Sequence, residues 1–212
     1  MHNLVSTLSK VATRYAPSRI LSYDTAHVFK VLQLANQHEK ISRNLLQEEL
    51  GLGEGSVKTL VKHLKRGELV ETSNAGMQMT GKGKNIYKKI SETISAEVTL
   101  AQCSVTLGRF NHAILVKDMG SEIISGIEQR DAAIKAGAIG ATTLIFQDGK
   151  FLMPDRKQDS LRNDTKLKEK IMESLEPQEN DVIIIASSEN KKNADIAAKS
   201  AALYTISRHE RH

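Results

Sequence analysis

The sequence has a single cysteine, no apolar run long enough to cross a membrane, and no signal peptide. Cys103 has no second cysteine with which to form an internal disulfide, and this suits a reducing cytoplasm. A membrane-spanning helix needs roughly 20 apolar residues. Residues 1–20 also lack the apolar core and cleavage site of a signal peptide. We therefore expect a cytoplasmic protein with no membrane segment.

The sequence also lacks the motifs that mark common enzymes. It contains no HExxH, no CxxC pair and no GxxxxGK[ST] phosphate-binding loop. A lone thiol at Cys103, with His112 further along the chain, is weak evidence for a nucleophile, because such a cysteine is more often a small buried side chain. The sequence thus predicts no enzyme, no catalytic residue, no metal and no cofactor.

What is present is an uneven distribution of charge. Residues 1–95 carry 14 Lys and Arg against 8 Asp and Glu, a net charge of +6, whereas the remaining residues carry 16 against 17, a net charge of −1. A basic first part beside a near-neutral second part indicates two domains, residues 1–95 and 96–212, of which the first binds a polyanion. The alternative is a basic surface that binds nothing.

The first domain has the pattern of a winged helix-turn-helix. Apolar residues recur at helical spacing in three segments, within 26–35, 45–50 and 57–64, and a glycine-containing turn joins the last two. Asp24, Thr25 and Ser42 are suited to cap the first two helices, and Gly67 to end the third. A hairpin around Ser73-Asn74-Ala75-Gly76 follows, and then a lysine-rich helix capped by Thr80.

The stretch LLQEELGLGEGSVKTLVKHLKRGELVE resembles the core of bacterial and archaeal winged-helix regulators, over about residues 25–90. The resemblance implies that the third helix enters the major groove of double-stranded DNA. A winged helix that binds another protein is the alternative. We predict base contacts from the first turns of this helix and backbone contacts from its end, the wing and the next helix. The predicted DNA-binding residues are Ser56, Lys58, Thr59, Lys62, His63, Lys65, Arg66, Asn74, Lys82 and Lys84.

The second domain is expected to have an α/β fold, so that the whole chain is of the α+β class. Its elements are predicted in the order strand, helix, hairpin around Asp148-Gly149, helix, strand and closing helix. This is a ferredoxin-like (βαββαβ) domain with an extra C-terminal helix, which leaves one sheet face for a ligand or a second subunit. The alternative is a small three-layer sheet with the final helix on the other face.

The segment SGIEQRDAAIKAGAIGATTLIF, residues 125–146, is the candidate ligand site of this domain. A helix that begins after Gly126 can hold an anion between its N–H groups and Arg130, and Thr142 and Thr143 begin the next strand. Glu128 and Asp131 complete the predicted ligand-binding set. The alternative is an ordinary helix-turn-strand, in which Asp131 and Lys135 form a helix ion pair.

This segment, joined to YAPSRILSYDTAHVFKVL, resembles an archaeal family of winged-helix transcription regulators with a C-terminal domain of unknown function. The resemblance implies a transcription regulator but brings no ligand and no catalytic residues. A homodimer is expected, because one winged helix reads few base pairs. The C-terminal domain then senses a small molecule or mediates dimerisation. A second reading is a winged helix fused to a small enzyme domain, in which Glu128, Arg130 and Asp131 act on a phosphorylated metabolite.

Overall fold

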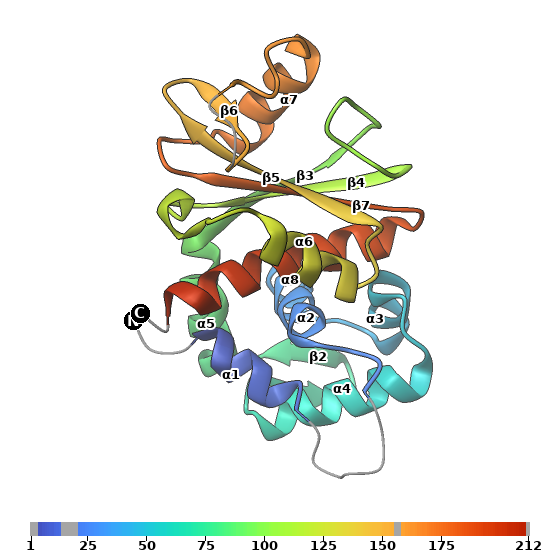
Figure 1. Ribbon diagram of the computed structural model, residues 1–212. Helices are drawn as coiled ribbons and strands as arrows, with labels where there is room; N and C mark the ends of the chain where they lie inside the picture. The colour runs from blue at the N-terminus through green and yellow to red at the C-terminus, as the bar shows by residue number, and fades with distance from the viewer. Residues whose placement is uncertain (1–3, 14–20, 155–157, 211–212) are drawn as a thin grey trace. The chain divides into compact units, whose positions relative to one another are not determined.

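The computed structural model in Figure 1 describes residues 4–13, 21–154 and 158–210 of the chain. These residues form two compact units, Met1–Ile90 and Ser91–His212. The sequence placed this boundary near residue 95, which lies just inside the first strand of the second unit. In the parts of the chain that are described, no helix has both the length and the apolar character needed to cross a membrane.

The first unit begins with four helices: α1 (Leu4–Val11), α2 (Thr25–Gln37), α3 (Arg43–Leu50) and α4 (Glu54–Arg66). The Asp24 side chain accepts hydrogen bonds from the first-turn amides of α2, and Ser42 Oγ accepts one from Leu45 N at 3.1 Å. Gly51, in the left-handed conformation, ends α3 and leads into the short turn before α4. The capped helix-turn-helix agrees with the prediction, whereas α1 was not among the predicted helices.

A hairpin and a further helix complete the first unit. Strands β1 (Val70–Ser73) and β2 (Gly76–Met79) pair antiparallel, and Ile41 adds a bridge to Met77. Thr80 Oγ1 accepts a hydrogen bond from Gly83 N at 3.1 Å, and α5 (Gly81–Thr93) follows. The wing therefore lies between α4 and the capped helix α5.

The helix α5 approaches the start of the wing closely at one residue. Gly83 is buried, and a Cβ atom placed on it would overlap the carbonyl oxygen of Leu69 and lie 3.1 Å from its carbonyl carbon. Leu69 is itself fully buried, and its carbonyl accepts a hydrogen bond from Thr80 N at 3.1 Å. Glycine is therefore required at position 83 to let α5 pack against this backbone.

The second unit is a five-stranded antiparallel sheet with helices on both faces (Figure 1). The strand order is β3-β4-β7-β5-β6, and every adjacent pair is antiparallel. A short 3-10 turn, Gly120–Glu122, precedes α6. The elements are β3 (Ile94–Leu100), β4 (Phe110–Val116), α6 (Ile127–Lys135), β5 (Gly140–Gln147), β6 (Lys150–Leu152), α7 (Thr165–Leu175), β7 (Val182–Ser188) and α8 (Lys191–His209).

The predicted element order is correct from β4 to α8, but β3 was not among the predicted elements and the ferredoxin-like strand order is wrong. In that fold the second strand of the hairpin lies between the two strands of the first βαβ unit. Here β7 takes that place between β4 and β5, and β6 pairs only with β5 at the edge. The reason is burial: all seven residues of β7 are buried, which requires a central strand, whereas β6 has only three residues.

The sheet has three layers, as in the predicted alternative, but the helix that lies on the other face is α7 and not the final helix. The final helix α8 packs with α6 on one face of the sheet, and α7 covers the other face. Leu167, Ile171 and Leu175 of α7 pack in a cluster with Leu144 of β5 and Ile183 of β7. Because helices cover both faces, the open sheet face expected from the sequence is largely occupied.

Candidate functional site

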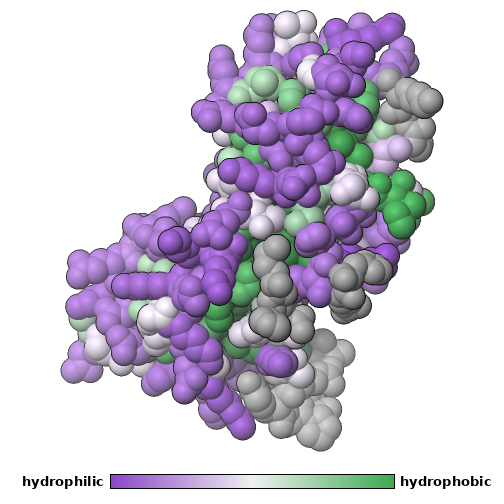
Figure 2. All heavy atoms as spheres, turned by 90° about the vertical axis from the view of Figure 1, so that its left-hand side faces the viewer, coloured by the Kyte–Doolittle hydropathy of each residue, from purple (hydrophilic) through white to green (hydrophobic). Residues whose placement is uncertain are grey.

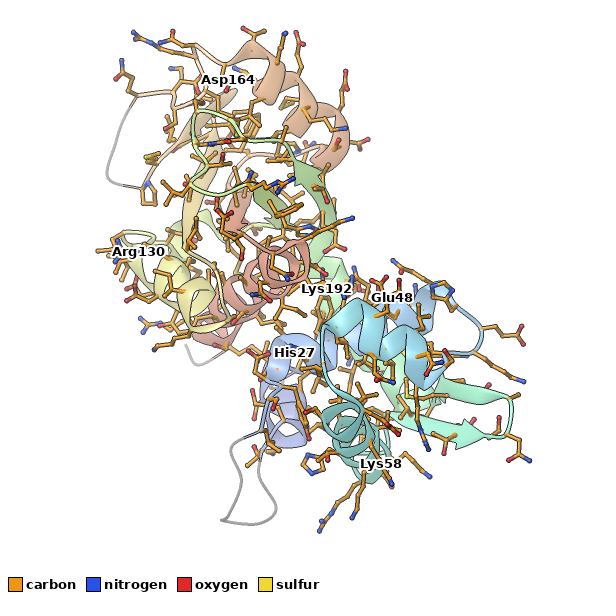
Figure 3. The ribbon with its side chains drawn as sticks, turned by 90° about the vertical axis from the view of Figure 1, so that its right-hand side faces the viewer. His27, Glu48, Lys58, Arg130, Asp164 and Lys192 are labelled. Carbon is orange, nitrogen blue, oxygen red and sulfur yellow. The ribbon has the colours of Figure 1, made fainter. Side chains whose placement is uncertain are left out.

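Helix α4 has one buried face and one basic face. Val57, Leu60, Val61 and Leu64 are buried against the rest of the first unit. Lys58, on the side of α4 turned away from His27 of α2 in Figure 3, is exposed. Exposed or partly exposed on the same helix are Ser56, Thr59, Lys62, Lys65 and Arg66. On the side that Figure 2 presents, the surface of the first unit is mostly hydrophilic.

His63 is the exception among the predicted DNA-binding residues of α4. Its side chain is buried, with 7% exposed, and its Nδ1 lies 2.6 Å from the hydroxyl of Tyr23. Burial lowers the pKa of His63, a hydrogen bond with the Val11 backbone opposes this, and the charges of Arg66 and Lys62 lower it further. The placement of His63 on the outer face is therefore wrong, because its ring joins α4 to the segment before α2.

The wing and α5 present the remaining predicted residues at the surface. Asn74 is exposed at the tip of the hairpin, and Lys84 is exposed in the first turns of α5. Lys82 Nζ lies 3.0 Å from Glu68 Oε2, in a pair whose side chains are both largely exposed. Such a surface pair is weak, so Lys82 keeps its charge available to a phosphate.

The predicted ligand segment forms a small hollow in the second unit. The hollow has a volume of about 180 Å³ and includes Arg130, Thr142 and Thr143 in its lining. Ser125 and Gly126, which the sequence did not single out as ligand contacts, also line it. Glu128 and Asp131 do not line it, although both were predicted with the others.

The partners of these residues define which groups face the hollow. Thr142 Oγ1 donates a hydrogen bond to Val105 O at 2.7 Å, and is therefore already engaged. Arg130, on the outer side of α6 in Figure 3, has its Nη2 3.3 Å from Asp131 Oδ1. Glu128 accepts a hydrogen bond from Ser125 Oγ at 3.3 Å. Thr143 Oγ1 has no hydrogen-bond partner among the described residues, although the side chain is buried.

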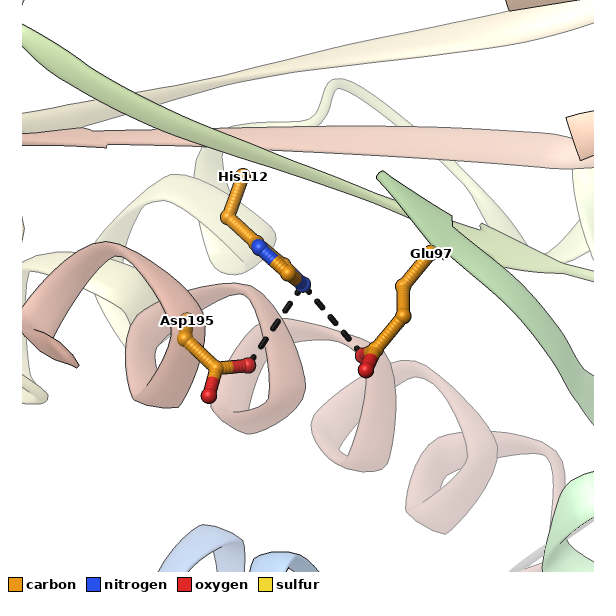
Figure 4. A group of neighbouring side chains, drawn as sticks. All are labelled: Glu97, His112 and Asp195. Atoms are coloured by element: carbon orange, nitrogen blue, oxygen red, sulfur yellow. Dashed lines mark hydrogen bonds and ion pairs between the residues drawn. The ribbon is translucent and has the colours of Figure 1, made fainter. Parts of the chain in front are cut away.

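A second group of ionisable side chains lies on the other strands of the sheet. His112 Nε2 of β4 lies 3.3 Å from Glu97 Oε2 of β3 and 3.4 Å from Asp195 Oδ1 of α8 (Figure 4). Their ligand atoms lie within 4.8 Å of one another, which is the spacing of a metal site. The sequence missed this group, because the residues come from three distant segments.

Lys199 supplies the positive charge that this group requires. Its side chain is fully buried, its ammonium lies 2.6 Å from Glu97 Oε2, and it also contacts Asp195. Burial would raise the pKa of the Glu97 carboxyl, but His112 and Lys199 outweigh burial and hold it well below the usual range. The arrangement is a salt-bridge network that ties α8 to β3 and β4.

Two family models match the chain, one in each unit. Residues 26–94 match the model described as CggR N-terminal DNA binding domain, and residues 107–206 match a domain of unknown function, DUF4443. The prediction of a DNA-binding N-terminal domain followed by a C-terminal domain of unknown function is therefore confirmed. The mixed helix-and-sheet fold class, with a helix after the last strand, is confirmed as well.

Similarity to individual proteins agrees with this assignment. The Central glycolytic genes regulator of Bacillus subtilis (strain 168) is 26% identical over 147 residues, which are 63% of this chain and 43% of that protein. The chain thus spans less than half the length of this curated relative. A solved structure of a hypothetical protein from Pyrococcus horikoshii OT3 has 27% identity and a TM-score of 0.71, and the match covers 89% of this chain and 96% of that one.

Proposed function

We propose that this chain, built from a DNA-binding domain and a DUF4443 domain, is a transcription regulator that binds double-stranded DNA as a homodimer. The observation that carries the proposal is the basic outer face of α4, in a domain that matches a DNA-binding model. Lys58, Lys62, Lys65 and Arg66 are all exposed there. The Bacillus relative is named as a regulator of genes, which supports the same class of function.

The residues of α4 have distinct roles in this proposal. The first turns hold Ser56, Lys58 and Thr59, whose lengths and polar groups suit base edges in the major groove. Lys62 reads bases or holds a phosphate, and Lys65 and Arg66 at the end of the helix hold phosphates. Asn74 of the wing and Lys84 of α5 contact the flanking backbone. His63 has no contact with DNA, because it is buried.

Dimerisation follows from the small number of base pairs that one winged helix reads. Two half-sites about one helical turn apart, roughly 34 Å, raise both affinity and specificity. The second unit has exposed apolar side chains that suit a subunit contact: Ile124 is 73% exposed, Ile127 50% and Ile134 45%. We assign the subunit contact to the second unit on this basis.

The second unit also senses a small molecule in this proposal. An effector changes DNA affinity only if it binds the two subunit arrangements with different affinities. A site on α6, next to the exposed isoleucines, is suited to such a difference. The proposal includes no catalytic step, so the effector is released unchanged.

The first test is selection from random-sequence duplexes by the purified full chain at two salt concentrations. We expect a two-fold-symmetric motif, and an affinity that falls by about 0.9 log units per log unit of salt for each phosphate contacted. The variant Lys62→Ala/Arg66→Ala is expected to lower this slope by about 2 and to weaken binding to every sequence by roughly 100-fold, at about 1.5 kcal/mol per charged contact.

The matched control is Lys166→Ala/Lys170→Ala, which removes the same charge from exposed positions of α7. It is expected to leave DNA affinity within about twofold, because α7 belongs to the other unit. Equal effects of the two variants would show that net charge, and not the α4 face, drives binding. Absence of salt-dependent binding in the wild type would instead indicate a protein-binding winged helix.

A further inference from the structure

The N-terminus of α6 has an unusual combination of groups around the 180 Å³ hollow. Gly126 is the N-cap, in the left-handed conformation with φ 75°, and no side chain caps the helix there. The first N–H groups of any helix have no acceptor within the helix, and they carry the positive end of its dipole. Ser125 Oγ accepts a hydrogen bond from only one of them, Ile127 N, at 3.3 Å. This end of α6 therefore offers donors to an anion.

Thr143 gives independent evidence for a ligand at the same place. The residue is 5% exposed, it lines the hollow, and its Oγ1 has no hydrogen-bond partner among the residues that the structure describes. A Cβ atom on Gly126 would lie 3.3 Å from this oxygen, so the hydroxyl is directly beside the N-cap. Buried hydroxyls are nearly always hydrogen-bonded, and this one is turned towards the N-terminus of α6, where the N-cap residue has no side chain to cap the helix.

Arg130 adds the positive charge. Its side chain is about half exposed, and its contact with Asp131 at 3.3 Å is a surface pair between sequence neighbours. Because such a pair is weak, the guanidinium is free to turn towards an anion in the hollow that Arg130 lines. Glu128 opposes this charge from the first turn, but its carboxylate is held by Ser125 and does not line the hollow.

We propose that this hollow binds a compact oxyanion, the phosphate or carboxylate group of a small metabolite. The first-turn amides of α6 and the Thr143 hydroxyl donate hydrogen bonds to the oxyanion, and Arg130 closes over it. A volume of about 180 Å³ equals about six water molecules at ~30 Å³ each and is below the roughly 300 Å³ of drug-sized sites. The site therefore takes one anionic group with a few carbon atoms, and excludes a dinucleotide.

Only the regulatory effect of anion binding rests on the proposed function. If the chain is a regulator, this hollow is its effector site, and the occupant changes the geometry of α6 next to the exposed isoleucines. Binding of the anion itself does not depend on DNA. The two proposals can therefore fail separately.

The test is titration of the full chain with inorganic phosphate and, separately, with sodium acetate, followed by NMR of the backbone amides and by calorimetry. We expect saturable binding of at least one ion, with the largest shifts at the amides of residues 127–130 and 143. Tighter binding of phosphate identifies a phosphorylated metabolite, and tighter binding of acetate a carboxylate. If neither ion binds saturably, or if the shifts lie elsewhere, the proposal is wrong.

Four variants separate this site from general attraction to a basic protein. Arg130→Gln is expected to weaken binding of the preferred ion at least tenfold, and Thr143→Val severalfold. Lys135→Gln, which removes the same charge at the other end of α6, is the control and should change affinity less than twofold. Glu128→Gln should tighten binding, because it removes a negative charge from the first turn. Equal losses for Arg130→Gln and Lys135→Gln would overturn the assignment.

A DNA-binding measurement with and without the preferred ion distinguishes the two proposals. If the ion binds at α6 but DNA affinity does not change, the site stands and its regulatory role is wrong. If DNA binding is intact and the ion does not bind, the site is wrong and the regulator proposal stands.

Discussion

Substitution of alanine for two glycines of α5 should have opposite effects on stability. Alanine is the better helix former by up to about 1 kcal/mol, and a Cβ atom on Gly81 meets nothing within 4 Å. A Cβ atom on Gly83 overlaps the carbonyl of Leu69, which is backbone and cannot change rotamer. Gly83→Ala therefore has to move α5 away from the start of the wing.

The cost of this movement can be estimated from its parts. Overpacking of a buried site costs about 1–3 kcal/mol. Loss of the hydrogen bond from Thr80 N to Leu69 O adds about 1 kcal/mol. After the gain in helix propensity, Gly83→Ala is expected to destabilise the first unit by about 1–3 kcal/mol, a fall in melting temperature of roughly 5–20 °C. Gly81→Ala should be neutral or stabilise by a few tenths of a kcal/mol.

The assay is thermal unfolding by circular dichroism at 222 nm, with hydrogen exchange of residues 54–66 to assign the transition to the first unit. Exchange is needed because the chain has two units, which need not unfold together. Equal melting temperatures for the two variants would refute the close packing of α5 on Leu69. A selective loss of protection in α4 of Gly83→Ala would support it.

Three further predictions concern buried polar groups. The pKa of His63 is lowered in the folded state, so the unfolded chain binds the proton first as the pH falls. The first unit should therefore lose stability as the pH falls through about 6.5. In urea titrations at pH 7.5 and 5.5, His63→Gln should make this loss of stability smaller. Lys199→Met should destabilise the second unit by about 3–5 kcal/mol in thermal melts at pH 7, because it leaves the carboxylates of Glu97 and Asp195 without their shared cation. A loss under 1 kcal/mol would contradict the salt-bridge network. Thr143→Val should be neutral or stabilise by up to about 1 kcal/mol in ligand-free protein, whereas a clear loss would show that the hydroxyl has a partner.

The parts of the fold that the sequence predicted are those with local causes. Asp24, Ser42 and Thr80 were recognised as N-caps because a cap bonds to amides two or three residues away. The hollow at α6 was partly predicted for the same reason. Arg130 and Thr143 are joined by a short helix-turn-strand, so their proximity is a property of one segment.

The parts that were missed depend on distant segments. The burial of His63 is decided by Tyr23, which lies 40 residues earlier. The Glu97–His112–Asp195 group depends on the register of β3 with β4 and on the position of α8. The position of β7 in the sheet depends on competition between strands for the centre. Helical spacing and turn residues in the sequence carry no information about these three long-range arrangements.

The central position of β7 has a consequence for the order in which the chain folds. The first unit is complete by Ile90, so it can fold while the rest of the chain is still being synthesised. The sheet of the second unit cannot be completed in this way, because β4 and β5 do not pair with each other and both pair with β7. In β7, Ser188 pairs with Phe110 of β4 and Ser187 pairs with Gly140 of β5. A nascent chain that ends before residue 182 is therefore expected to have a folded first unit, while β4 and β5 still lack the strand that pairs with both of them.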